Sequence, residues 1–485
     1  MEEFGDVNLT KLSWPQLTLF AYTLYCAGAY GIEQAVSVGG AAGVILALFG
    51  FGLVWALPQA LIVAELSTAF PKSGSSLYWV EEALGCRWAL VNAWCLSLGQ
   101  IFDAAIWPAM LTSYASTLIP SLNIQSIAIS VQFICIILVC IINIAGLRVL
   151  VITSLVTNLF TLTPFILFPF VALFLKQTFT FSAILQIPQI STSNAAVFIS
   201  TILWTFQGLP NIGNLAAEVY NPRKSFPITM SALIILMVLT YGTAVALGVA
   251  LQPDLTQWQE GYFSTLLATI SPWLGVFITL GSTIAMLSGG LTSTAVYSRF
   301  IAAAAKEGYI PFPILGQQKM TRFKTPVPAI LLLSCTTFAL TNLNFTSLLA
   351  VDTTLNVISI VLVVISYLRL RYVQPDLKRP YEIPGGIFVA WLISIPSLLL
   401  SCFAFIIIAT SGEAIPVTFA FVLLVVIYII GYIREKTNAC WGRWKYSSSE
   451  RKRRIDIDID DEDKEDEEDE VEEEFFEITK HLLLP

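Results

Sequence analysis

The chain of 485 residues is 56% hydrophobic and only 12% charged, with a mean hydropathy of +0.75, which excludes a protein surrounded entirely by water. The formal net charge of −8 is unevenly distributed: residues 446–485 hold 17 Asp and Glu against 6 Lys and Arg, so the rest of the chain carries +3. The single histidine, His481, lies in this tail. Because the hydrophobic part has no histidine, histidine catalysis and a histidine proton relay are excluded there.

Apolar stretches of about 20 residues recur from Trp14 to Tyr432, and each can cross a hydrocarbon core of ~30 Å as a helix rising ~1.5 Å per residue. Runs such as 133–142 are apolar on every face, which excludes the alternating pattern of a membrane β-barrel. The sequence therefore predicts an all-α polytopic membrane protein with about twelve transmembrane helices. They are expected at residues 14–37, 43–69, 88–118, 125–144, 149–175, 195–217, 227–251, 271–304, 326–343, 346–370, 387–409 and 414–432.

The basic residues between these stretches predict the orientation in the membrane. If both termini are cytosolic, Lys176 is the only one of the 26 Lys and Arg residues that faces outward, as the positive-inside rule requires. The charged start leads into a long span, so residues 1–13 are expected to be a cytosolic segment and not a cleaved signal. Residues 433–485 are expected to form a disordered acidic tail in the cytosol, with a cytosolic partner of the tail as the alternative interpretation.

The first predicted span contains helix-breaking residues at mid-depth. Gly28 and Gly31 precede Ile32 and Glu33, and a continuous helix gains nothing from two glycines and a carboxylate there. Cys26 lies eleven residues after Pro15, or ~16 Å along a helix, which is about half of the hydrocarbon core. We therefore expect a break in helix 1 at the midplane.

The sixth predicted span has the same character and runs in the opposite direction. Phe206, Gln207, Gly208, Pro210 and Asn211 follow one another closely, about 18 Å from the outer start of the span. Two broken helices would thus meet at the centre, where half-helix N-termini offer N–H groups to a carboxylate and unwound carbonyls accept from an ammonium. The alternative is that the glycines only permit close helix packing.

Five acidic residues lie in or near the spans, where an ionised carboxylate is costly and usually faces a cavity, a partner or a proton path. Glu33 and Asp103 are the candidates to contact a substrate amine or to take up a proton. Glu65 and Glu218 lie near the cytosolic mouth and are interpreted as gate or proton-coupling residues, or as partners of nearby bases. Asp352 is interpreted as a solvated helix end with no role.

Five short motifs lie in the spans and in the loops between them. They are Ala64-Glu65-Leu66, Ile101-Phe102-Asp103, Glu218-Val-Tyr-Asn221-Pro222-Arg223-Lys224, Lys306-Glu-Gly308 and Lys378-Arg379-Pro380. Over residues 15–432 the chain resembles the amino acid–polyamine–organocation transporters, and helices 1 to 3 are similar to the eukaryotic polyamine uptake branch, which is related to the L-type amino acid transporters.

The resemblance implies a five-plus-five inverted repeat, with helices 1–5 at 14–176, helices 6–10 at 177–370 and two added helices at 371–432. It also implies alternating access, with proton symport or exchange, and no cofactor other than a coupled proton. Gly28 and Gly31 would bind a substrate carboxyl or backbone group, Glu33 and Asp103 a substrate amine, and Phe206 and Gln207 would line or gate the pocket. Ile32, Gly208 and Asn211 complete the predicted substrate site, with no metal.

One departure from the polyamine branch concerns the cargo. Pro210 stands where that branch carries an acid, and Ser288-Gly289-Gly290 replaces another, so an amino acid is as well supported as a polyamine. The predicted function is a secondary transporter of amino acids or polyamines in the lipid bilayer, with the plasma membrane favoured over an endolysosomal or vacuolar membrane. No nucleic-acid binding and no enzymatic activity are expected, and the alternatives are a transporter-like nutrient receptor or a channel.

Overall fold

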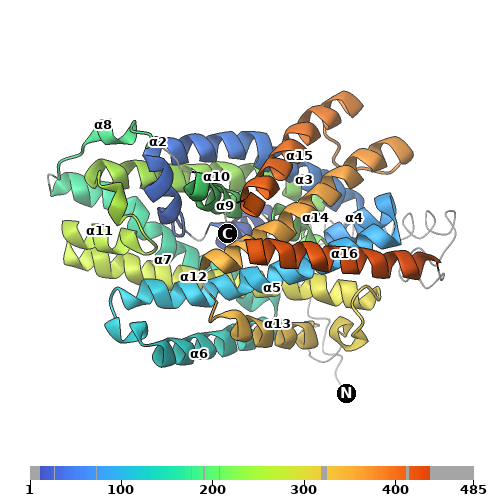
Figure 1. Cartoon of the computed structure of the whole chain (residues 1–485), viewed down its shortest axis with the longest axis horizontal. Helices are drawn as coiled ribbons and strands as arrows, with labels where there is room; N and C mark the ends of the chain where they lie inside the picture. Colours follow the sequence, from blue (N-terminus) through green and yellow to red (C-terminus); the bar gives the residue numbers. More distant parts are fainter. Residues whose placement is uncertain are drawn as a thin grey trace, which may run out of the picture.

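The computed structural model describes residues 11–26, 28–72, 74–175, 177–188, 192–206, 208–317, 325–343, 345–410 and 414–436. Within these residues the chain is a bundle of helices that run broadly side by side (Figure 1), and the only strand-like pairing is an isolated bridge between Leu12 and Val219. Nine predicted spans each contain one uninterrupted main helix: α5 (Cys86–Ser116), α6 (Gln125–Ile144), α7 (Leu147–Phe174), α10 (Pro222–Leu251), α12 (Pro272–Lys306), the shorter α13 (Val327–Leu340), α14 (Phe345–Val373), α15 (Gly386–Thr410) and α16 (Ala414–Lys436).

The remaining predicted spans are built from shorter pieces. The first and second predicted spans are made from α1 (Trp14–Tyr25), α2 (Glu33–Phe51), a π-helical turn (Gly52–Ala56) and α3 (Leu57–Ala69). Gly40 separates the two spans inside α2, because its φ of +63° breaks the helical path. The sixth span is divided into α9 (Thr192–Phe206) and the 3₁₀ segment η3 (Leu209–Glu218).

Eight helices among the described residues are long and apolar enough to cross a membrane, and shorter apolar helices lie at 327–340 and 420–434. The broken helices supply the remaining spans in two halves each. The prediction of an all-α polytopic membrane protein is therefore confirmed. The division into repeats at 14–176 and 177–370 stays a prediction.

Three short helices occupy stretches that were expected to be connections: α4 (Ser75–Leu84), α8 (Phe181–Ile184) and α11 (Tyr262–Ile270). Gly74 and Gly85, with φ of +102° and +89°, turn the chain sharply at both ends of α4. Between them α4 packs against α5 and α14. A buried helix of this kind has no long apolar run, so the hydropathy pattern does not reveal it.

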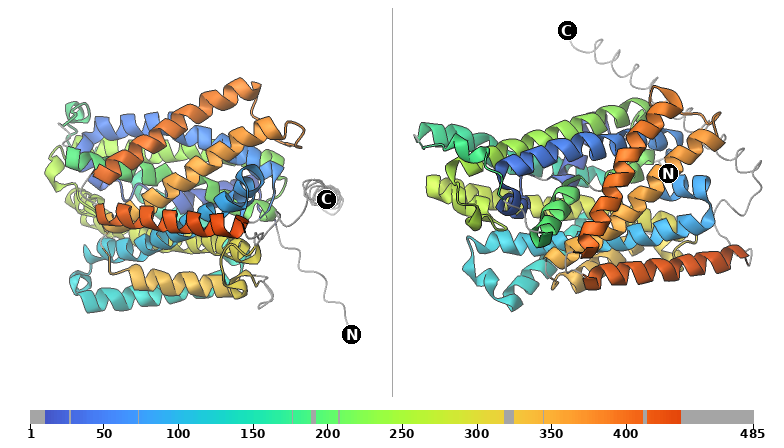
Figure 2. Two further views of the ribbon diagram at one scale, coloured as in Figure 1. Left: turned by 45° about the vertical axis from the view of Figure 1, so that its right-hand side comes forward. Right: turned by 45° about the horizontal axis from the view of Figure 1, so that its top comes forward.

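Burial separates the central helices from the peripheral ones. In an 18-residue hydrophobic stretch of α14, 83% of the residues are buried inside the bundle. The corresponding share is 78% in α5 and only 28% in α6. In Figure 1 and in the left view of Figure 2, α6 and α13 lie side by side along one edge. Because α5, α12 and α14 form the packed centre, polar residues on them are the first candidates for a site.

We name the two ends of the bundle by their tryptophans. The Trp14 end is where α1, α5 and α10 begin and α14 ends, with α4 beside it at the right of Figure 1. The Trp258 end is where α5 and α10 end and α11 begins, at the left of Figure 1. The breaks in helices 1 and 6 lie between these two ends.

Candidate functional site

The break in helix 1 lies where the glycines predict it. The helix α1 ends at Tyr25, and α2 begins at Glu33. Gly28 and Gly31 have φ of +100° and +80°, a region that disfavours any residue with a Cβ atom. A Cβ atom on Gly31 would also lie 2.9 Å from the Trp204 ring on α9, so this position requires glycine for space as well as for conformation.

The break in helix 6 is also present, but the chain after it is not an α-helix. Gly208, with φ of +82°, follows the end of α9, and the chain then continues as the 3₁₀ segment η3 to Glu218. Pro210 has no N–H group and so cannot donate the bond to the Phe206 carbonyl that would continue α9 as an α-helix. The predicted binding residue Gln207 lies outside the described residues.

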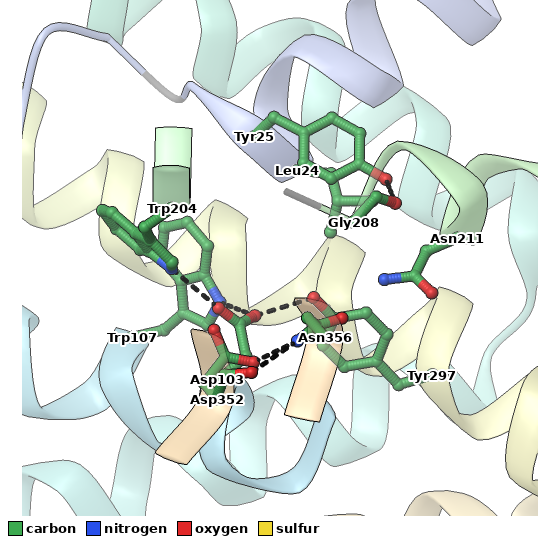
Figure 3. Close-up of a pocket in the computed structure, with 10 residues that line it drawn as sticks. All are labelled: Leu24, Tyr25, Asp103, Trp107, Trp204, Gly208, Asn211, Tyr297, Asp352 and Asn356. Atoms are coloured by element: carbon green, nitrogen blue, oxygen red, sulfur yellow. Dashed lines mark hydrogen bonds between the residues drawn. The ribbon is translucent and has the colours of Figure 1, made fainter. Parts of the chain in front are cut away.

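The two breaks are joined by a tyrosine. The hydroxyl of Tyr25, the last residue of α1, donates a hydrogen bond to the carbonyl oxygen of Gly208. Leu24, Tyr25, Gly208 and Asn211 line one small pocket at this junction (Figure 3). The predicted meeting of two broken helices at the centre of the bundle is therefore what the structure contains.

The carboxylate of Asp103 on α5 lines this pocket and accepts three side-chain hydrogen bonds. Its Oδ1 accepts from Trp204 Nε1 at 3.0 Å, and its Oδ2 accepts from the Tyr297 hydroxyl at 2.7 Å and from Trp107 Nε1 at 3.3 Å (Figure 3). Three donors from α5, α9 and α12 fix the orientation of the carboxylate and compensate for its removal from water.

Asp352 was interpreted as a solvated helix end, and this interpretation is wrong. Its exposure is 0%, it lines the same pocket as Asp103, and its Oδ1 accepts from Asn356 Nδ2 at 2.5 Å (Figure 3). The helix that carries it begins deep in the bundle, because the ring of Phe345 packs edge-on against Trp204 at 6.1 Å. Asp352 is thus two turns farther into a helix that already starts at pocket depth.

The pocket combines two carboxylates with aromatic rings. Trp107 and Trp204 lie 5.8 Å apart between ring centroids, and Tyr25 and Tyr297 add two further rings to the lining. Aromatic faces and carboxylates together attract a cation. The free space is about 20 Å³, room for one water molecule, so the pocket must expand before it can hold an organic solute.

The predicted substrate residues fall into two groups. Asp103, Gly208 and Asn211 line the pocket, whereas Gly28, Gly31, Ile32, Glu33 and Phe206 are not part of that lining. Glu33 is 0% exposed, and its two carboxylate oxygens accept from the Tyr114 hydroxyl at 2.8 and 3.0 Å. The Tyr114 hydroxyl in turn accepts from the Gly31 N–H at 2.9 Å, so it bridges the break to the carboxylate.

Glu65 and Glu218, the predicted gate residues, are paired with arginines at the Trp14 end. Glu65 lies 2.5 Å from Arg371 Nη2 and 3.3 Å from Arg379 Nε, and its Oε2 accepts from the Ile383 N–H at 2.9 Å. Glu218 lies 2.5 Å from Arg299 Nε. Each pair joins helices that are distant in the sequence, so the expected pairing with the neighbouring bases is not the arrangement found.

The sequence alone did not identify the aromatic donors of Asp103 or the second carboxylate. The contact between Trp107 and Asp103 could have been predicted, because Trp107 lies one helical turn after Asp103 on α5. Asp352 and Asn356 form a similar i, i+4 pair of polar residues inside an apolar span. Trp204 and Tyr297 lie on other helices, and no spacing in the sequence connects them to Asp103.

The comparisons with known proteins agree with this architecture. A model of the amino acid permease family matches residues 12–432, so the chain belongs to the amino acid permease family. A probable polyamine transporter of Arabidopsis thaliana is 27% identical over 440 residues, which cover 87% of this chain and 86% of that protein. The polyamine transporter PUT1 of Oryza sativa subsp. japonica is 27% identical over 374 residues, covering 74% of this chain and 67% of that protein.

A shorter match is to a transporter of another kind. The cationic amino acid transporter 2, vacuolar, of Arabidopsis thaliana is 26% identical over 180 residues, which cover 36% of this chain and 28% of that protein. The family and the pocket together make the chain an integral, multi-pass membrane transporter.

Proposed function

We propose that this permease is a secondary transporter whose cargo is a polyamine, moved by alternating access through the pocket between the two breaks. The observation that carries the proposal is that Asp103 and Asp352 line the same pocket together with aromatic rings. The absence of an acid at Pro210 weakened the polyamine interpretation, but Asp352 supplies a second carboxylate from another helix. Two carboxylates suit a solute with several ammonium groups better than a zwitterion.

The start of α2 supports the same choice. An amino acid carboxyl would bind at the free N–H groups of this half-helix. The Glu33 carboxylate already lies at this start: it accepts from the Tyr114 hydroxyl, which itself accepts from the Gly31 N–H. The protein itself thus provides a carboxylate where a substrate carboxylate would bind, and a polyamine has no carboxylate to compete for that place.

Transport activity in proteoliposomes tests this proposal. We expect labelled spermidine to accumulate under an inward proton gradient, and leucine to be neither carried nor competitive. Asp103→Asn and Asp352→Asn should each reduce spermidine uptake about a hundredfold at subsaturating concentration, because removing one partner of a buried charge contact costs ~2.7 kcal/mol or more. Asp376→Asn, an exposed carboxylate in the α14–α15 connection, is the matched control and should leave uptake unchanged. Uptake of leucine but not spermidine would overturn the proposal.

Cationic amino acids are the second candidate cargo, favoured by the match to a cationic amino acid transporter. Arginine has a guanidinium, an α-ammonium and an α-carboxylate, and binding of that carboxylate at the start of α2 would require the Glu33 carboxylate to move away. Arginine uptake that increases in Glu33→Gln while spermidine uptake decreases would support the polyamine assignment for the native chain. Arginine uptake that exceeds spermidine uptake in the unmodified chain would favour this second candidate.

We also propose that transport is coupled to protons, that both termini face the cytosol and that the protein resides in the plasma membrane. Basic residues gather at the Trp14 end, which supports this orientation by the positive-inside rule. They include Lys11, Lys72, Arg87, Lys224, Lys306, Arg371, Lys378 and Arg379. Residues 437–485 lie outside the described part, and a cytosolic partner for this tail stays a prediction. Protease access to the tail in sealed cells tests the orientation, and cleavage from outside would contradict it.

A further inference from the structure

The Trp258 end has a hollow of about 580 Å³ that is separate from the central pocket. Its lining comes from α2, α5, α9 and the loop between α10 and α11. The lining residues are Gln34, Ser37, Val38, Ser113, Asn194, Val197, Trp258, Gln259 and Glu260. The volume is large enough for a drug-sized solute, and six of these nine side chains are polar or charged.

Glu260 is the only carboxylate in this lining, and it was not singled out in the sequence. It lies in the loop before α11 and interacts with the Ser113 hydroxyl at the end of α5. Burial raises the pKa of the Glu260 carboxyl to about 7, although the hydrogen bond with Ser113 lowers it. Among the described residues, no lysine or arginine forms a salt bridge with Glu260.

The surroundings of Glu260 strengthen its attraction for a cation. The Glu33 carboxylate and the Tyr114 hydroxyl lie close enough to interact electrostatically with it. The buried Oε1 of Gln34 has no hydrogen-bond partner among the described residues. A carboxylate, a second carboxyl group nearby and an acceptor without a donor are groups that bind an ammonium ion.

The hollow and the central pocket are lined by residues of the same two helices, α5 and α9. On α9, Val197 lines the hollow and Trp204 lines the pocket two turns later, which is ~10 Å along the helix. On α5, Ser113 in the hollow is ten residues from Asp103 in the pocket, or ~15 Å. The two cavities are therefore separated by about two to three helical turns along α5 and α9.

We propose that the hollow is a second binding site, specific for an organic ammonium group, in which Glu260 is the anionic contact and a polyamine is held before it enters the central pocket. The identity of the ligand rests on the proposed function, whereas the location of the site rests on the hollow itself. A site that binds substrate and transition state equally contributes to KM and not to kcat. Glu260 should therefore affect KM.

Equilibrium binding of labelled spermidine to the purified full chain in lipid nanodiscs tests the proposal. We expect two sites in the unmodified protein, and loss of one of them in Glu260→Gln with the other retained. Asp103→Asn should retain the site that Glu260→Gln loses. In proteoliposomes, Glu260→Gln should raise the KM for spermidine about tenfold, which corresponds to ~1.4 kcal/mol, at nearly unchanged kcat.

Two further variants serve as controls for the assignment of this second binding site. Asp254→Asn removes a fully exposed carboxylate from the same loop, outside the hollow lining, and should change neither stoichiometry nor KM. Val38→Trp fills the hollow from α2 and should reproduce the loss of one site, even if Glu260→Gln folds poorly. Equal effects of Asp254→Asn and Glu260→Gln would indicate only a surface-charge effect and would overturn the proposal.

The outcomes separate this inference from the proposed function. Spermidine transport with the same KM and stoichiometry in unmodified protein, Glu260→Gln and Val38→Trp would overturn the second site and leave the function intact. Spermidine binding that depends on Glu260 without any spermidine transport would support the site and overturn the function. No spermidine binding to the unmodified protein would overturn both.

Discussion

Two glutamates toward each end of the bundle have different kinds of partner. At the Trp14 end, Glu65 and Glu218 form short ion pairs with arginines from other helices. At the Trp258 end, Glu33 and Glu260 interact with the hydroxyls of Tyr114 and Ser113 instead. One end is therefore held by charge pairs, while the other keeps negative charge beside a hollow of about 580 Å³.

This difference suggests that the two ends have different roles in the conformation observed. Buried ion pairs join helices and must separate before the Trp14 end can open, so they stabilise its closed form. Carboxylates without a cationic partner among the described residues remain able to attract one from outside. The comparison thus predicts that changes at the Trp14 end alter the conformational equilibrium, whereas changes at the Trp258 end alter affinity.

Among the changes that test this comparison of the two ends, Arg371→Met at the Trp14 end is expected to have the largest effect. Glu65 is only 1% exposed, and its loss of Arg371 leaves a buried charge with one weaker partner, which costs ~3 kcal/mol in comparable cases. We expect spermidine uptake to fall about tenfold and the amide of Ile383, which donates to Glu65, to exchange hydrogen faster. Initial uptake rates and hydrogen exchange measured by mass spectrometry are the readouts.

A double variant supplies the control for this prediction. Glu65→Gln combined with Arg371→Met removes both charges, so it should restore part of the uptake that Arg371→Met loses. If the double variant is no better than the single one, the pair does not hold this end closed. An unchanged exchange rate at Ile383 in Arg371→Met would contradict the arrangement directly.

A smaller effect is expected from Tyr114→Phe near the Trp258 end. The substitution leaves the Glu33 carboxylate and the Gly31 N–H without their shared partner, and an unsatisfied buried group costs ~1–3 kcal/mol. We expect uptake to fall about fivefold, with a matching decrease in thermal stability. Tyr78→Phe removes a similar tyrosine–carboxylate hydrogen bond, to Glu307 at the other end, and should change uptake much less.

The smallest expected effect is a dependence of the KM for spermidine on pH, which would arise from Glu260 at the Trp258 end. A carboxyl with a pKa of about 7 is mostly neutral at pH 6 and mostly ionised at pH 8, so Glu260 should attract an ammonium better as the pH rises. Glu33 and Tyr114 face it from α2 and α5, and Asp254 shares its loop. We expect the KM for spermidine exchange, without a pH gradient, to fall about threefold from pH 6 to pH 8. In Glu260→Gln the KM should not vary with pH, and a parallel decrease there would assign the titration elsewhere.

The sequence predicted the features that depend on local chemistry. Gly28, Gly31 and Gly208 break their helices because backbone conformation is set by the residue itself. Hydrophobic length likewise predicted the spans, since a bilayer imposes one length on every helix.

The features that depend on tertiary packing were not accessible in the same way. Asp352 was misjudged because the start of an apolar stretch does not reveal how deep the helix begins. Glu260 lies in a loop, and only the folding of that loop against Ser113 makes its position significant. The arginine partners Arg299 and Arg371 are 81 and 306 residues from their glutamates, beyond any spacing argument.

The isolated bridge at the Trp14 end has a consequence for following the transport cycle. The Leu12 N–H donates to the Glu218 carbonyl at 2.8 Å, and the Tyr220 N–H donates to the Leu12 carbonyl at 2.9 Å. These bonds join the start of α1 to the end of η3 through main-chain atoms alone, so any side chain there can be replaced without removing them, except by proline, which lacks the N–H group. A fluorescent reporter attached at Lys11 would therefore report any movement of α1 and η3 during transport as a single signal.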